Sequence, residues 1–293
     1  MESNRKKVLG RALIFQLFLY ITENLMVMLM SGLGSRVLLI ETLIMNIIVF
    51  ALPLYYYRKN TGYIPFLTPV TEEHNEALGR RLNIVIMYII ALSLTVTAVN
   101  VFGMMGELIV KTLGADVADR LPDDIFSLVV IGVRSVIFAA FLEESLFRGA
   151  VIHAYADESK IKTVLVSAGL FALMHYGFLS MIYAFAAGLV IAYFAILTHS
   201  IAFAFAVHLG SNLMTFVFTA LRMQLGEKVI TISNVTAIIF AVISVVSIVT
   251  TAGYYFKKRA KEDKKAKQKE KSEVCAEIVV YSVLAFILCI INI

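Results

Sequence analysis

The chain has 293 residues with a formal net charge of +5; 60% of its residues are hydrophobic and 16% are charged. A soluble domain of this length could not hide so much apolar surface from water, so the composition excludes a soluble globular protein. The chain is expected to be an integral membrane protein. Its long apolar runs are expected to be helices, because lipid accepts only backbone whose hydrogen bonds close internally.

Nine apolar stretches are candidate transmembrane helices, for which roughly 20 residues are enough to cross the hydrocarbon core. In chain order they are predicted at 8–30, 37–57, 84–106, 125–154, 162–175, 179–198, 201–221, 229–256 and 274–293. The expected fold class is therefore all-α, a polytopic membrane bundle of eight to nine transmembrane helices.

Lysine and arginine gather at four places that fall on one side of the membrane if all nine spans are real. The clusters lie at 5–7, 58–81, 160–162 and 257–271. Because positive charge marks cytoplasmic loops, the N-terminus is predicted to be cytoplasmic, in the plasma membrane if the protein is bacterial. The acidic loop around Asp123 and Asp124 is expected on the opposite side.

The segment 257–273 holds nine basic and four acidic residues. Its composition is typical of a solvated cytoplasmic linker that fixes topology and touches anionic lipid head groups. No aromatic residue interleaves the charges, so no nucleic-acid partner is expected.

Two carboxylates and a guanidinium stand inside the fourth span, at Glu143, Glu144 and Arg148. Each charge near the bilayer centre costs at least about 2.5–3.5 kcal/mol, so such residues suggest a functional site. Glu144 and Arg148, four residues apart with the acid first, can form an ion pair along the helix. Glu143 lacks a helical cation partner, and a carboxylate of raised proton affinity suits a general base. The alternative is a charged cluster that only holds helices together.

Three further polar side chains lie in later spans: His175 ends the fifth, and His208 and Asn212 share one face of the seventh. With Glu143 they could activate water and stabilise an oxyanion, or equally supply three or four ligands to one divalent metal. Each alone is more typical of helix packing. His153 and His199, near span ends without a partner pattern, are expected to have no functional role.

Together these residues form three motifs in order: Glu143-Glu-Ser-Leu-Phe-Arg148, Phe171-Ala-Leu-Met-His175 and His208-Leu-Gly-Ser-Asn212. The pattern resembles the CPBP or Abi family of intramembrane endopeptidases, which includes the type II CAAX prenyl proteases. The resemblance covers about residues 127–219.

The resemblance implies that Glu143 and His175 activate the attacking water, and that His208 and Asn212 stabilise the oxyanion. Glu144 and Arg148 match supporting positions. It leaves two cofactor alternatives open: a divalent metal such as zinc, held by Glu143, His175 and His208, or a metal-free glutamate mechanism. The implied partners are membrane lipid and a membrane-associated peptide or lipidated protein substrate, without nucleic acid.

The spans and motifs divide the chain into five parts. Residues 1–124 are expected to hold N-terminal transmembrane helices with a cytoplasmic loop at 58–83, and 125–222 the catalytic core of the CAAX-protease type. A further transmembrane helix at 223–256, the linker at 257–273 and a hydrophobic helix at 274–293 follow.

The favoured function is an intramembrane endopeptidase that acts on a CAAX-type substrate or a peptide of a maturation or immunity system. The alternative is a non-catalytic immunity or scaffold protein that binds a peptide in the same polar cavity. A transporter with Glu143 in a proton relay is less favoured, because the span pattern shows no inverted repeat. The sequence has no His-Glu-x-x-His and no aspartate in a span, which excludes site-2 zinc and presenilin-type chemistry.

Overall fold

The structure is a computed structural model that describes residues 2–68, 84–114, 121–175 and 177–266. Regular structure in these residues is entirely helical, which confirms the predicted all-α fold class. Seven of the helices are long and apolar enough to cross a membrane. The chain is therefore a multi-pass integral membrane protein.

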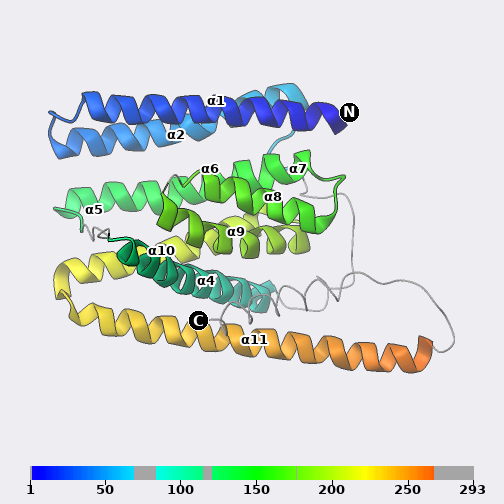
Figure 1. Ribbon diagram of the computed structural model, residues 1–293. Helices are drawn as coiled ribbons and strands as arrows, with labels where there is room; N and C mark the ends of the chain where they lie inside the picture. The colour runs from blue at the N-terminus through cyan, green and yellow to red at the C-terminus, as the bar shows by residue number, and fades with distance from the viewer. Residues whose placement is uncertain (1, 69–83, 115–120, 176, 267–293) are drawn as a thin grey trace.

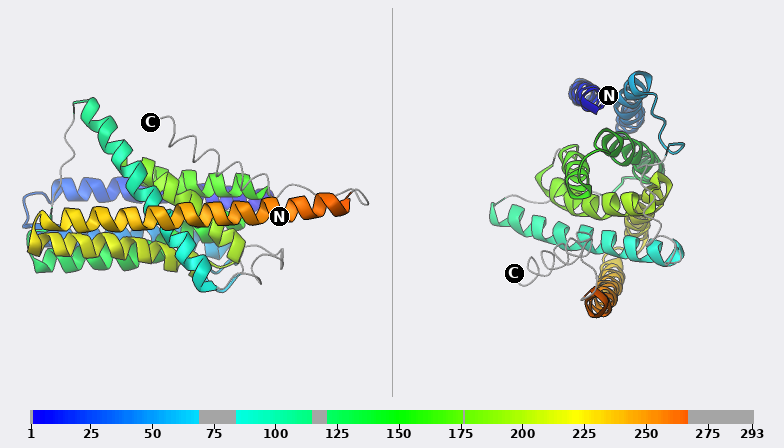
Figure 2. Two further views of the ribbon diagram at one scale, coloured as in Figure 1. Left: turned by 90° about the horizontal axis from the view of Figure 1, so that it is seen from below. Right: turned by 90° about the vertical axis from the view of Figure 1, so that its right-hand side faces the viewer.

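The long helices are α1 (Glu2–Leu29), α2 (Ser35–Thr61), α4 (Ile84–Thr112), α9 (Phe178–Thr198), α10 (Ile201–Leu225) and α11 (Lys228–Ala266). They form an elongated bundle in which most of them run side by side and α4 crosses obliquely (Figures 1 and 2). The predicted span at 125–154 is a continuous rod of five helical pieces: α5 (Ile125–Gly132), η1 (Val133–Phe138), α6 (Ala139–Glu144), η2 (Ser145–Val151) and α7 (Ile152–Ala154).

The fifth predicted span is a shorter helix than the others, α8 (Lys160–Leu173), with 14 residues. At 1.5 Å per residue it rises about 21 Å, less than the roughly 30 Å of a hydrocarbon core. The chain then turns and returns along α8 as α9 (Figure 1). With α8 the described residues account for eight of the nine predicted spans, and the ninth, at 274–293, lies outside them.

Helix α11 continues to Ala266, so its last turns include the first ten residues of the segment expected as a linker. The rest of that segment lies outside the described residues. The start of α1, the end of α2, the start of α8 and the end of α11 all lie at the end of the bundle marked N in Figure 1. The basic clusters next to these helix ends therefore share one end of the molecule.

The rod formed by α5 to α7 occupies the middle of the bundle. Seen along the bundle in Figure 2, α1 and α2 lie on one side of the green central helices and α11 lies on the other. The second half of the rod is wholly enclosed, with Leu146, Phe147, Ala150, Val151 and Ile152 fully buried. Its polar side chains consequently lie away from both water and lipid.

Two π-helical stretches interrupt this rod, and each is matched by a side chain from another helix. A π-turn displaces the ladder and frees backbone carbonyl groups. The carbonyl of Ser135, in η1, accepts a hydrogen bond of 2.8 Å from Asn212 Nδ2 on α10. That of Phe147, in η2, accepts one of 2.8 Å from Ser167 Oγ on α8. The π-turns thus tie the central rod to its neighbours.

Ion pairs tie the N-terminal end of α1 to the turn between α7 and α8. Arg5 lies 2.5 Å from Asp157, and Glu158 lies 2.6 Å from Lys6 and 2.9 Å from Lys162. His153 sits beneath this turn, with Nδ1 2.9 Å from the hydroxyl of Tyr57. These contacts give His153 a structural role.

Candidate active site

Glu144 and Arg148 form a fully buried ion pair on the central rod. Arg148 Nη1 donates to Glu144 Oε1 over 2.9 Å, and neither side chain has any exposed surface. Arg148 Nη2 also donates to the carbonyl of Gly188 on α9, 3.3 Å away. The guanidinium lies over the ring of Phe171, 4.4 Å from its centroid, which adds a cation–π contact. Three helices therefore meet at one cation.

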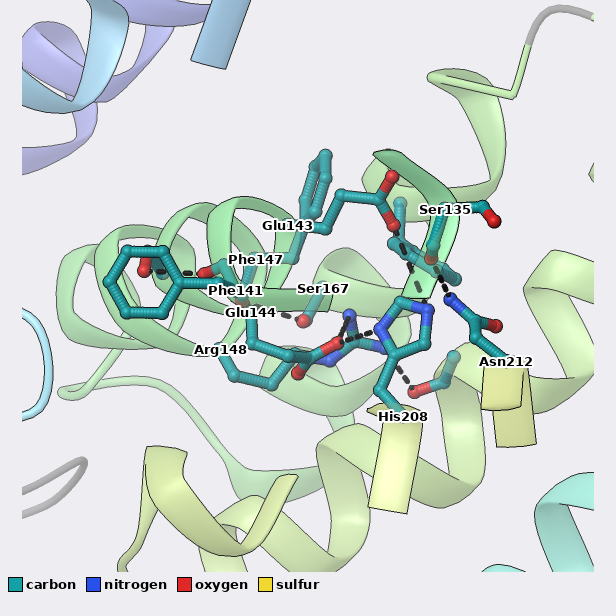
Figure 3. A network of polar contacts seen from close by, with 12 residues as sticks. Ser135, Phe141, Glu143, Glu144, Phe147, Arg148, Ser167, His208 and Asn212 are labelled. Carbon is teal, nitrogen blue, oxygen red and sulfur yellow. Dashed lines mark hydrogen bonds and ion pairs between the residues drawn. The ribbon is translucent and has the colours of Figure 1, made fainter. Parts of the chain in front are cut away.

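His208 is oriented by the same carboxylate. Its Nδ1 lies 2.7 Å from Glu144 Oε1, and its side chain is almost completely buried (Figure 3). Because Glu144 is ionised against Arg148, it can only accept, so Nδ1 carries the proton. When the imidazole is neutral, Nε2 presents a lone pair, and Glu144 acts as the group that fixes the tautomer and the ring direction of His208.

Glu143 lies beside this pair and is only partly buried. Its Oε2 is 3.9 Å from Nε2 of His208, and Figure 3 shows the carboxylate directed toward the imidazole. The separation is too long for a direct hydrogen bond. It is suited to one water molecule that donates a hydrogen to each of the two groups.

His175 lies just past the end of α8, where that helix stops inside the bundle. Its Nδ1 is 2.9 Å from the carbonyl oxygen of Phe171, which can only accept, so this nitrogen also carries the proton. The hydroxyl of Ser180 donates to the backbone carbonyl of His175 over 3.0 Å. The imidazole is thus held by its own helix and by α9.

Phe171 connects the two histidines. Its ring meets that of His175 edge-on at 4.7 Å and that of His208 at 5.7 Å. The structure therefore brings Glu143, Glu144, Arg148 and His208 into one polar network and joins His175 to it through an aromatic ring.

Asn212 is attached to the neighbouring π-turn. Its Nδ2 donates to the carbonyl of Ser135, which commits one of its two N–H groups (Figure 3). Nothing in the sequence indicated Ser135 or Gly188 as partners, because both act through backbone carbonyls. Phe171 stood in a motif, although nothing in the sequence indicated its position between two histidines and a guanidinium.

Zinc was one of the cofactor alternatives from the sequence, with Glu143, His175 and His208 as ligands. In the described part of the chain, no three side chains of His, Cys, Asp or Glu are grouped so that they could hold a metal ion. The arrangement does not fit that ligand set, so no step below depends on a metal.

Comparison with the models of known protein families gives a match. The family model of the type II CAAX prenyl endopeptidases, Rce1-like, matches residues 125–214. Neither the curated proteins nor the solved structures give a match to the chain. The matched segment begins at the first residue of α5 and ends within α10, so it contains the whole polar network. The comparison agrees with the resemblance seen in the motifs, and the chain carries, at residues 125–214, a domain of the Rce1-like family of type II CAAX prenyl endopeptidases.

Proposed function

We propose that this protein is an intramembrane endopeptidase that hydrolyses a peptide bond of a membrane-associated protein or peptide. The observation that carries the proposal is the facing pair of Glu143 Oε2 and His208 Nε2, 3.9 Å apart. The buried ion pair of Glu144 and Arg148 holds the histidine in place. Such a pair can position and deprotonate one water molecule beside a carbonyl carbon.

In the proposed reaction a water molecule donates one hydrogen to Glu143 and the other to Nε2 of His208. Its free lone pair attacks the carbonyl carbon, a C–O bond forms, and Glu143 takes the proton. The tetrahedral intermediate then collapses, the C–N bond breaks, and protonated Glu143 returns its proton to the leaving nitrogen. Glu143 is thus base and then acid, as it would be in a metal-free glutamate mechanism.

The division of roles among the other residues follows their hydrogen bonds. His175, with its proton fixed on Nδ1, offers Nε2 as an acceptor only, so it can take a hydrogen of the attacking water only in place of His208. Activation of the water is the role that the family resemblance gives it. Asn212 keeps one N–H for the substrate carbonyl. His208 is better placed to orient water than to donate to an oxyanion, since its Nδ1 proton points at Glu144. Zinc assistance stays a prediction from the sequence.

A substrate with a lipidated cysteine near its C-terminus fits the family description and an active site enclosed among membrane helices. A peptide of a maturation or immunity system is the other substrate class that the sequence suggests. Cleavage of a synthetic peptide with a prenylated C-terminal CAAX sequence, compared with the same peptide unprenylated, distinguishes the two.

The proposal is tested by Glu143→Gln in the full-length protein reconstituted in liposomes. Removing the general base is expected to lower kcat about 10²–10⁴-fold, because general acid–base catalysis contributes that much. Thermal unfolding should change little, since among the described residues no side chain makes a hydrogen bond to the Glu143 carboxylate and the imidazole of His208 is 3.9 Å away. Glu107→Gln, at an exposed site on α4, is the matched control and should keep full activity.

Unchanged cleavage by the Glu143→Gln variant would refute the assignment of the base. The alternative, a non-catalytic binding protein, predicts a result of its own. If it is right, cells remain protected, or a peptide partner still binds, when Glu143 and His208 are both replaced by alanine.

A further inference from the structure

A pocket of about 240 Å³ lies at the end of the bundle that carries the basic clusters. It is lined by residues 66–68, which follow α2 in the chain, and by residues 199–202, where α9 ends and α10 begins. The side chains of Leu67, Thr68 and Ala202 are exposed. The pocket is therefore open to a molecule that approaches from outside the bundle.

Each of the two walls of this pocket contains a bulky residue with a positive φ angle. Phe66 has a φ of 65° and His199 one of 52°, and among the described residues no other residue except glycine has a positive φ. His199 caps the end of α9, where glycine is the usual residue. Such backbone conformations are uncommon for bulky residues and cluster at binding sites and switch regions, which suggests a binding role for the pocket.

Both walls pack on the central rod next to the buried ion pair. A Cβ atom added to Gly149, the residue after Arg148, would lie 3.5 Å from Tyr63 Cε1, from Pro65 Cβ and from Ile201 Cδ1. The segment after α2 and the start of α10 therefore meet the rod at the same residue, directly beside the arginine of the polar network.

The ring of Phe66 connects the pocket with the polar network. It stacks on the ring of Phe141, with centroids 5.1 Å apart, and meets that of Phe205 edge-on at 6.2 Å. Phe141 precedes Glu144 by three residues, and Phe205 precedes His208 by three residues. Each of these two rings is thus about one helical turn from a member of the network, and the pocket adjoins the proposed active site through direct aromatic contacts.

The distance along α10 relates the pocket to the bond that would be cleaved. Ile201 precedes His208 by seven residues, which corresponds to about 10.5 Å along a helix axis. An extended peptide advances about 3.3 Å per residue. A substrate whose scissile bond lies at His208 would therefore place a residue about three positions from that bond beside the pocket.

The lining of the pocket favours an apolar side chain. The hydroxyl of Thr68 donates to the carbonyl of Ile64 over 3.0 Å. The hydroxyl oxygen of Ser200 accepts from the backbone N–H of Phe203 over 3.1 Å, so both hydroxyls are committed to their own turns. Apart from His199, the other side chains of the lining are apolar. The volume is below the roughly 300–1,000 Å³ of sites for drug-sized ligands, so it suits one side chain rather than a prenyl chain.

On these grounds, and within the proposed function, we propose that the pocket is a specificity subsite that holds one apolar side chain of the substrate peptide, about three residues from the scissile bond. Phe66 and Ala202 stand on its two walls and determine the size of the side chain that it accepts. Burial of that side chain stabilises the bound peptide and its transition state alike, and so raises kcat/KM. The pocket sets the rate at which a peptide is cleaved rather than the position of the cleaved bond.

The test uses the full-length protein in liposomes and a series of prenylated CAAX peptides, in each of which one residue near the cleaved bond is changed from alanine to leucine. At a position about three residues from the bond, leucine should raise kcat/KM at least about tenfold over alanine. Ala202→Leu fills the pocket, so the two peptides should then be cleaved at similar rates. Ala156→Leu, at an exposed alanine in the turn between α7 and α8, is the matched control and should keep the preference of the wild type.

A second measurement depends neither on turnover nor on a substitution in the pocket. A peptide with a photoactivatable leucine analogue about three residues from the bond is bound to the Glu143→Gln variant and irradiated. Mass spectrometry should locate its cross-links at residues 66–68 or 199–202. The same analogue placed next to the scissile bond should instead label residues around Glu143.

The outcomes separate this proposal from the proposed function. If the wild type cleaves the peptides without a preference at this position, if Ala202→Leu keeps the preference, or if the cross-links lie elsewhere, the subsite is refuted and the peptidase function stands. If the wild type cleaves none of the peptides, the peptidase function fails and the subsite fails with it. Loss of the preference in Ala202→Leu, together with cross-links to the pocket, supports the subsite.

Discussion

A single oxygen atom, Oε1 of Glu144, accepts from two side chains that come from different helices. Arg148 reaches it from the next turn of the central rod and His208 reaches it from α10. Oε2 of the same carboxylate has no hydrogen-bond partner among the described residues. The arrangement neutralises Arg148 and orients His208 at once, so the ion pair and this histidine form one unit.

Replacing Arg148 should therefore damage folding and activity together. Arg148→Met leaves the Glu144 carboxylate buried without its cation, and loss of one partner of a buried pair typically costs about 3–5 kcal/mol. A denaturant titration of the purified protein in detergent measures the change in the free energy of unfolding. The double variant with Glu144→Gln as well should be more stable than Arg148→Met alone, because no uncompensated charge remains. If the double variant were the less stable of the two, the ion-pair interpretation would be wrong.

At this scale the sequence predicted the residues better than their partners. The spacing of Glu144 and Arg148 was sufficient to predict their pairing, because a helix places residues four apart on one face. The contact of His208 with Glu144 could not be predicted, since it joins residues 64 positions apart on different helices. The same holds for the bond from Asn212 to Ser135, which depends on a carbonyl freed by a π-turn.

At the scale of elements, the contact between α8 and α9 positions much of the site. Gly188 allows the two helices to approach closely: a Cβ atom at this position would lie 3.1 Å from Phe171 Cδ1 and 3.2 Å from the Cα of Ala168. The ring of Phe171 in turn supports both histidines and Arg148. A displacement of α8 from α9 would therefore disturb the positions of both histidines and of Arg148.

Gly188→Ala should be destabilising despite the smallness of the added methyl group. Overpacking of a closely packed contact costs about 1–3 kcal/mol, and here the ring of Phe171 would have to move. Cleavage of the prenylated CAAX peptide should fall together with the melting temperature of the protein. Gly169→Ala on α8 is the matched control: a Cβ there meets nothing within 4 Å, so its stability should be equal or slightly higher. Equal effects of the two changes would contradict the packing argument.

The elements were predictable from the sequence to different degrees. Long apolar runs predicted the helices, and the predicted span at 125–154 agrees with the central rod. Hydrophobicity could not reveal the π-turns within it, because they change hydrogen bonding without changing composition. Composition also could not distinguish α8 as a helix that stops inside the bundle, although the predicted run at 162–175, with 14 residues, is shorter than a full span.

At the scale of the whole molecule, charged groups fasten the α1–α2 hairpin to the rest at its two ends. At one end Arg5 and Lys6 pair with Asp157 and Glu158. At the other, Arg36 lies 2.6 Å from Asp124, which caps the first turn of α5. The hairpin exposes many large apolar side chains to the surroundings, as expected for helices that face lipid.

These end contacts predict a dependence on pH. Hydrogen bonds from Ser127, its backbone N–H first, and from Arg36 lower the pKa of Asp124 to about 2. A lowered folded-state pKa gives a stabilisation that is present above the ordinary value of 3.8 and is lost as the pH falls toward 2. The melting temperature of the wild type, measured from about pH 5 down to about pH 2, should show this decline.

Asp124→Asn should melt earlier than wild type at neutral pH and show a smaller decline on acidification. Asp123→Asn removes the same charge from the neighbouring exposed residue and should behave as wild type does. High salt should weaken the contribution of Asp124, because exposed pairs are screened. An acid profile of Asp124→Asn identical to that of the wild type would show that this end of the hairpin is not held by its charge.

The limited length of α8 has a consequence for substrate choice. The helix starts at the end of the bundle that carries the basic clusters and stops about 21 Å further in, which fixes the depth at which His175 meets the other groups. Under the proposed function, this depth determines which bond of a substrate is cleaved, more than the residues on either side of that bond do. Substrates of unrelated sequence should then be cut at a common distance from the membrane surface, and the cleavage position should shift along the chain when the membrane anchor of the substrate is lengthened.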